Sequence, residues 1–163
     1  MASARGEQAQ ADAHLERARQ RCHATEWQRV SARILRDRGE LAQAATLWER
    51  VAAAAPLDLA AQRAVAGLRQ ELAGRASVVA HLRALAERFA HHRGLNELLA
   101  LRLDEEPLPV QEEALRRLLA IAPANAWAQR QLAVVLAKQR RFPEALASAE
   151  AARHMAPNAA AGH

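Results

Sequence analysis

The sequence predicts an all-α protein: a right-handed α-solenoid of antiparallel helix pairs. Hydrophobic residues make up 51% of the 163 residues and aromatic residues only 3%, so alanine and leucine carry the apolar content. These two residues are among the strongest helix formers. In addition, one helical pattern returns along the chain at a nearly constant spacing, and a period of about 20–50 residues is typical of solenoids.

Two series of residues set this spacing. A proline or alanine ends each second helix, in nearly equal steps (34, 33 and 34): Pro56, Ala90, Pro123 and Pro157. A small residue follows a mostly apolar one inside each first helix: Ser31-Ala32, Val65-Ala66, Leu99-Ala100 and Leu132-Ala133. The third unit therefore lacks one residue after Ala100. We expect the deletion in the loop at residues 104–110, where Pro107 and Pro109 stop one helix and start the next.

Apolar residues at helical spacing predict two helices in each unit. Gly39 and Gly74 stand at predicted helix ends, where a left-handed residue is favoured. A further helix at residues 7–23 has few apolar residues and is expected either to cap the first unit or to fray. The chain is therefore predicted to contain eight or nine helices. The eight paired helices are expected at residues 25–37, 40–54, 59–72, 75–90, 95–105, 109–121, 125–139 and 143–155.

This pattern resembles the tetratricopeptide repeat (TPR) family. The motif positions are best matched in the first and fourth units, by Gly39, Ala44, Trp48, Val51 and Pro56, and by Phe142, Ala145, Ala152 and Pro157. The second unit departs at Val78 and Ala90, the third departs at Gln111, and the motif's tyrosine is absent throughout.

The resemblance implies a division of the chain into repeats. We expect an N-terminal tail with the extra helix at residues 1–24, and four repeats at 25–58, 59–92, 93–125 and 126–158. Residues 159–163 would begin a truncated further helix or form a disordered tail. The chain is then expected to be a fragment of a longer protein, or to use its uncapped C-terminal face for self-association.

The resemblance also implies a function. TPR proteins are non-catalytic scaffolds or adaptors, and such a protein binds a peptide or helix segment in the concave groove lined by its first helices. The alternative is a regulatory or substrate-presenting region of a larger bacterial enzyme or assembly. The family's groove positions fall here on Arg29, Arg33, Arg36, Arg63, Glu97, Asp104, Trp127, Arg130 and Lys138.

These groove residues allow two interpretations. Arginines on adjacent helices can hold carboxylates bidentately, which favours an acidic peptide partner, but they can equally form solvated rows. Trp127 can anchor a partner or pack near Leu119, whereas Trp48 is expected in the core. The clamp that binds chaperone C-termini is not expected, because Gly67 and Val134 stand in clamp-like places.

Composition argues against several other functions. The net charge of +5 and the pI of about 11 fit nucleic acid, an anionic membrane or an acidic protein. Interspersed acids and few aromatic residues argue against specific nucleic-acid binding. The longest apolar run, residues 51–57, is far below the ~20 residues of a membrane span. No apolar signal segment begins the chain, so we expect a cytoplasmic protein.

Cofactor chemistry is not expected either. Cys22 is the single cysteine, which excludes a cysteine metal cage. The histidines show no i, i+4 pair, and His91 and His92 are instead expected to contact the dipole at a helix end. No catalytic constellation or phosphate loop is present, so the sequence predicts neither an enzyme nor a cofactor.

Overall fold

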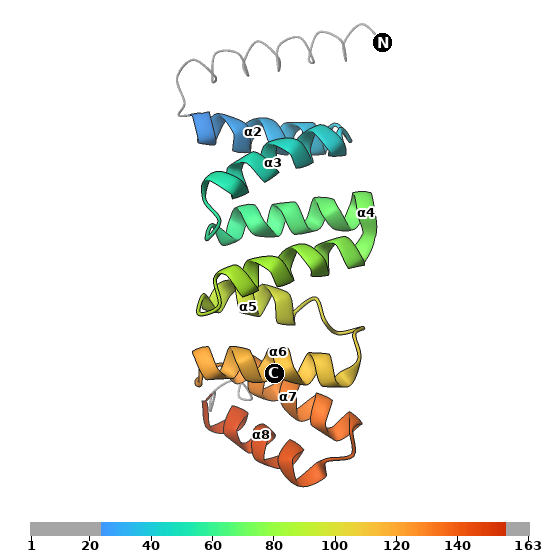
Figure 1. Ribbon diagram of the computed structural model, residues 1–163, viewed down its shortest axis with the longest axis vertical. Helices are drawn as coiled ribbons and strands as arrows, with labels where there is room; N and C mark the ends of the chain where they lie inside the picture. The colour runs from blue at the N-terminus through green and yellow to red at the C-terminus, as the bar shows by residue number, and fades with distance from the viewer. Residues whose placement is uncertain (1–23, 156–163) are drawn as a thin grey trace, which may run out of the picture. The chain divides into compact units, whose positions relative to one another are not determined.

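The computed structural model describes residues 24–155, and every regular element in that range is a helix. The helices are α2 (Ala24–Asp37), α3 (Leu41–Ala54), α4 (Leu59–Arg88), α5 (Arg93–Ala100), α6 (Leu108–Ile121), α7 (Ala126–Lys138) and α8 (Phe142–Met155) (Figure 1). The helix expected at residues 7–23 and the segment expected at 159–163 lie outside the described residues. The chain divides after Gly74 into two compact units, residues 1–74 and 75–163.

The core of the first unit joins α3 to the first half of α4. Helix α3 contributes Ala44, Trp48 and Val51, and α4 contributes Ala61, Val65 and Leu68. None of these residues is more than 5% exposed. Ala32 of α2 joins the same cluster. Alanines at these places let the helix axes approach, while the larger residues fill the space between them. Trp48 is therefore a core residue, as predicted.

One core cluster of the second unit lies between α6, α7 and α8, and other buried residues of this unit, such as Leu82 and Leu95, lie on the second half of α4 and on α5. The cluster is formed by Leu115, Leu118, Ala128, Leu132, Val135, Leu136 and Ala145. Glu112 is buried beside it and accepts hydrogen bonds from Gln139 (2.8 Å) and Arg141 (2.7 and 2.9 Å). These bonds hold the pKa of Glu112 below its ordinary value, so the buried carboxylate stays charged and ties the α7–α8 turn to α6.

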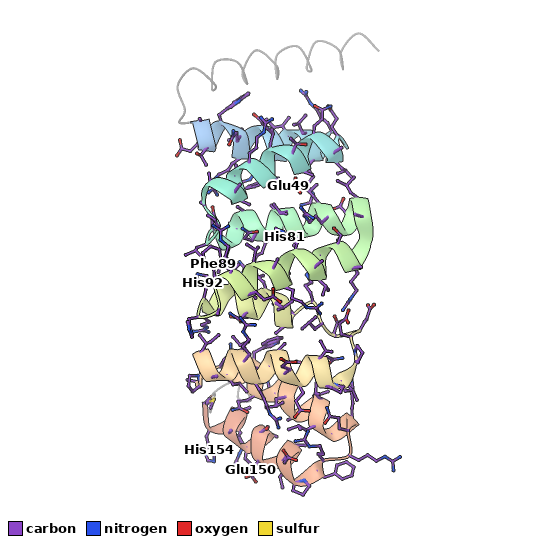
Figure 2. The ribbon with its side chains drawn as sticks, in the orientation of Figure 1. Glu49, His81, Phe89, His92, Glu150 and His154 are labelled. Carbon is purple, nitrogen blue, oxygen red and sulfur yellow. The ribbon has the colours of Figure 1, made fainter. Side chains whose placement is uncertain are left out.

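Three first helices begin with a side-chain cap at the same repeat position. The caps are Asp58, His92 and Asn125, at successive steps of 34 and 33 along the chain. His92 lies between α4 and α5 (Figure 2), and its Nδ1 accepts the Leu95 amide at 3.2 Å. The sequence suggested a dipole contact for this histidine. The structure assigns it instead to an N-terminus, where an unprotonated nitrogen satisfies a free N–H group.

The helix ends agree with the sequence prediction to within two residues, except at the end of α5. The helices expected at residues 59–72 and 75–90 share the label α4, but Gly74 between them has non-helical dihedral angles (φ 75°, ψ 179°) and separates two helices, as predicted. The helix expected at 95–105 is wrong at its C-terminus, because α5 ends at Ala100. Beyond it, Leu103 is only 2% exposed. Leu103 keeps the apolar pattern but is buried from a loop, which the pattern alone did not distinguish from a helix.

Exchanging Gly74 for alanine should destabilise the protein by roughly 1–3 kcal/mol, because this region of φ and ψ is essentially open to glycine only. Gly67 provides the matched control inside the same helix. Its φ is ordinary, and an added Cβ would meet nothing within 4 Å. Gly67→Ala should therefore stabilise the protein by about 0.5–1 kcal/mol. Urea unfolding of both variants measures the difference, and equal effects would contradict a strained kink at Gly74.

Candidate functional site

The short helix α5 borders a hollow in the second unit. The hollow has a volume of about 220 Å³ and lies between the end of α5, the start of α6 and the face of α7. The lining residues are Ala100, Leu101, Asp104, Gln111, Leu115, Trp127, Gln131 and Val135. The first helix of this pair has only 8 residues, against 13 in α7. The hollow thus lies where the repeat is least regular.

The loop after α5 is held by two side chains from elsewhere. Gln111 donates from Nε2 to the carbonyl oxygens of Asp104 (3.1 Å) and Glu106 (2.6 Å). Arg75 donates to the carbonyl oxygen of Arg102 (2.7 Å) and forms an ion pair with Asp104. The hydrogen bond from Arg75 holds the pKa of Asp104 below its ordinary value. Because these bonds tie down the loop, the hollow is preformed in the unit.

Apolar side chains form one wall of the hollow, and polar side chains form a comparable share of its lining. Leu101 is 47% exposed, and Leu115 and Val135 belong to the wall behind it. The side-chain amide of Gln131 and the indole of Trp127 bond to no other described residue, so both can pair with a ligand. An apolar wall beside a free amide suits an apolar side chain together with the backbone of a peptide.

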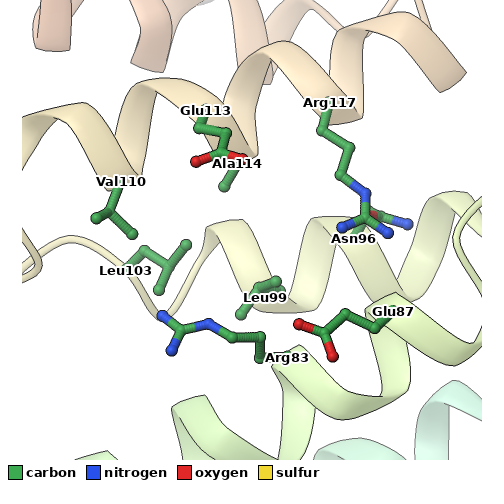
Figure 3. A pocket seen from close by; sticks show the side chains of 9 residues that line it. All are labelled: Arg83, Glu87, Asn96, Leu99, Leu103, Val110, Glu113, Ala114 and Arg117. Carbon is green, nitrogen blue, oxygen red and sulfur yellow. The ribbon is translucent and has the colours of Figure 1, made fainter.

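A smaller hollow of about 130 Å³ lies on another side of α6. In Figure 3, Val110, Glu113, Ala114 and Arg117 of α6 face Arg83 and Glu87 of α4, with Leu99 and Leu103 between them. Arg117 donates to the carbonyl oxygen of Ala86 at 2.5 Å and so bridges the two helices. This hollow has a smaller volume than the one beside Trp127, and both basic and acidic side chains line it.

In the first unit, two of the predicted groove arginines are held by acids. Arg29 forms an ion pair with Asp58, and Arg36 forms one with Glu71 at 2.8 Å. These contacts join α2 to the first half of α4 and to Asp58, which caps its N-terminus. Arg33 and Arg63 are exposed and form no ion pair with a described residue. Among the arginines predicted for the groove in this unit, only Arg33 and Arg63 are therefore free to bind a partner.

In the second unit, the hollow contains Trp127 and Asp104 from the predicted set. Glu97 lies 3.8 Å from Arg93, and neither Arg130 nor Lys138 lines the hollow. Sequence reasoning missed Leu101 and Gln131. Gln131 could have been found, because it follows Trp127 by four residues and shares its helix face. Leu101 could not, because the predicted helix ran through it.

The described residues contain no group of three or more histidine, cysteine or acidic side chains that could hold a metal ion. None of the helices at residues 24–155 is long and apolar enough to cross a membrane.

No protein-family model matches the sequence, and no curated protein matches it significantly. Solved structures do match the fold. MamA from Desulfovibrio magneticus RS-1 (residues 41 to the end) is 17% identical, with a TM-score of 0.65 over 96% of this chain and 89% of that chain. YrrB, described as a TPR protein with an unusual peptide-binding site, is 15% identical, with a TM-score of 0.63 over 96% and 82%.

A third similar structure is TTC0263, a thermophilic TPR protein of Thermus thermophilus. It is 20% identical, with a TM-score of 0.54 over 81% of this chain and 74% of that chain. At these identities the likeness establishes the fold, and the TPR-like architecture expected from the sequence is confirmed.

Replacing Arg29 with alanine should lower the free energy of unfolding by roughly 1 kcal/mol, because Arg29 pairs with the carboxylate that caps α4. Burial raises the pKa of Asp58, but hydrogen bonds from the Ala61 amide and from Arg29 outweigh it, and the pKa lies below the ordinary 3.8. The carboxylate therefore stabilises the fold above about pH 4, and this contribution is lost as the pH falls through the lowered pKa.

The loss caused by Arg29→Ala should accordingly shrink below pH 4, as measured by urea unfolding at pH 7 and pH 3. Arg33→Ala, one helical turn away and without a described partner, is the control and should change stability by less than about 0.5 kcal/mol at either pH. Equal losses for the two variants would show that the ion pair contributes nothing.

Proposed function

We propose that this chain, which has the paired-helix repeat fold of TPR proteins, is a protein-interaction scaffold that binds a peptide in the hollow beside Trp127. The observation that supports this most directly is the hollow itself: an apolar wall at Leu101 and Leu115, with an unpaired amide at Gln131. A peptide would insert one apolar side chain against Trp127 and pair its backbone with Gln131. Tryptophan is also the residue most enriched at binding hot spots.

An acidic residue next to the apolar anchor would suit the surroundings of the hollow. Arg130 directly precedes Gln131 and is exposed. It forms no ion pair with a described residue, so it is available for a carboxylate. Among the similar structures, YrrB is the one described as having a peptide-binding site. A peptide is therefore the first class of ligand to test.

The test is a selection of peptides from a random displayed library, followed by measurement of Kd for the best binder. Leu101→Asp and Gln131→Ala should each weaken binding about tenfold or more, because they remove the apolar wall and the free amide. Val134→Asp is the matched control. Val134 is 48% exposed, against 47% for Leu101, but does not line the hollow.

The control should bind within about twofold of the original chain, a difference of less than about 0.5 kcal/mol. Arg130→Glu should weaken binding only if the selected peptide carries an acid. Equal losses for Leu101→Asp and Val134→Asp, or a library that yields no binder, would contradict the proposal. Both substituted residues are half exposed, so the comparison does not depend on altering the core.

A further inference from the structure

In the first unit, α2 together with Leu47 of α3 borders an apolar hollow of about 300 Å³. It is lined by Trp27, Ser31, Ile34, Leu35, Arg38 and Leu47. Ser31 is 8% exposed, and its buried Oγ bonds to no described residue. Trp27 and Ile34 are only partly buried, although isoleucine is among the residues most often fully buried.

The repeat shows what normally covers such a face. Trp27, Ser31 and Ile34 stand one repeat, a constant offset of 34, before Ala61, Val65 and Leu68 on α4. On α4 these three positions are at most 1% exposed, in one cluster with Ala44, Trp48 and Val51 of α3. The second helix of the preceding pair therefore covers this face of α4. Within residues 24–155, no helix precedes α2 to do the same.

The sequence before α2 repeats the covering helix. Gly6, Ala11, Leu15 and Ala18 precede Gly39, Ala44, Trp48 and Val51 at a constant offset of 33. A step of 33 is native to this chain, since the caps His92 and Asn125 are separated by it. Gly39 turns the chain before α3 at φ 81°, and the other three residues are three of the four buried residues of α3, the fourth being Ala52. The earlier segment thus matches the residue types at these four positions, and Arg19 corresponds to Ala52.

We infer that residues 8–21, which correspond to α3 at the offset of 33, form the second helix of a preceding pair and cover the hollow on α2 through Ala11, Leu15 and Ala18. At 1.5 Å per residue this 14-residue segment is about 21 Å long, enough to cover the 14 residues of α2. Cys22 and His23 remain as the connection, and two residues suffice between antiparallel helices. Because the segment is joined directly to α2, its effective concentration exceeds that of any other chain.

The test uses a thiol placed in the hollow of the full chain. Ser31→Cys, in a Cys22→Ser background, puts the reporter where the native hydroxyl has no partner, so little is lost. Ala18→Asp places a charge in the covering face and should raise the rate of maleimide labelling about tenfold or more. Ala13→Asp is the matched control, because the same substitution falls roughly 170° around the helix from the centre of the covering face. It should leave the labelling rate unchanged.

Two further measurements keep the result unambiguous. A second reporter, Ala145→Cys on α8, should stay unreactive in the Ala18→Asp chain, because the covering helix acts on α2 alone. The protection of Ser31→Cys should not vary with protein concentration. Equal labelling in the Ala18 and Ala13 variants, exposure of both reporters, or protection that disappears on dilution would each overturn the inference. The last result would show that a second copy covers α2.

Discussion

The structure depends on one packing constraint: the second helix of a pair must fit against the first helix of the next. In the first unit this contact consists of Ala44, Trp48 and Val51 against Ala61, Val65 and Leu68. The small residues set how closely the helices approach, and the large ones fill the volume that remains. In the second unit, Ala128, Leu132 and Val135 occupy the same positions on α7 as Ala61, Val65 and Leu68 do on α4. The repeat length stays nearly constant along the chain, because each pair must present the same face again.

The candidate site arises where this regularity fails. Loss of one residue in the third pair coincides with a short α5 and with a loop that must be held by side chains from other elements. Arg75 and Gln111 do this by bonding to loop carbonyl groups. The space beside the loop becomes the hollow at Trp127. A hollow can thus form in a repeat protein at an irregular unit, while the regular units supply the rigid support.

Much of this fold was predictable from the sequence because its signals are local and periodic. The spacing of apolar residues predicted where the helices lie, and the recurring alanines and prolines predicted which helices form each pair. The end of α5 was not predictable, because Leu101 and Leu103 continue a helical pattern, although the loop that contains them is held by a long-range bond from Arg75 and local bonds from Gln111. The ion-pair partners of the groove arginines could not be predicted for a similar reason. Arg29 and Arg36 meet acids 29 and 35 residues away, and a list of exposed charges does not show such partners. Trp127 lines the hollow and, like Leu119, packs against the core of α6, α7 and α8, so its role as an anchor stays a prediction.

The central claim is that a peptide enters the hollow between α5, α6 and α7. The most direct measurement is a titration of the isotope-labelled chain with a selected peptide, followed by amide chemical shifts in NMR spectra. Our account predicts that the largest shifts fall at Leu101, Trp127 and Gln131, with a matching change in the indole resonance of Trp127. Shifts centred on Arg83, Glu87 and Arg117 would instead place the ligand in the smaller hollow on the other side of α6 and would contradict the account.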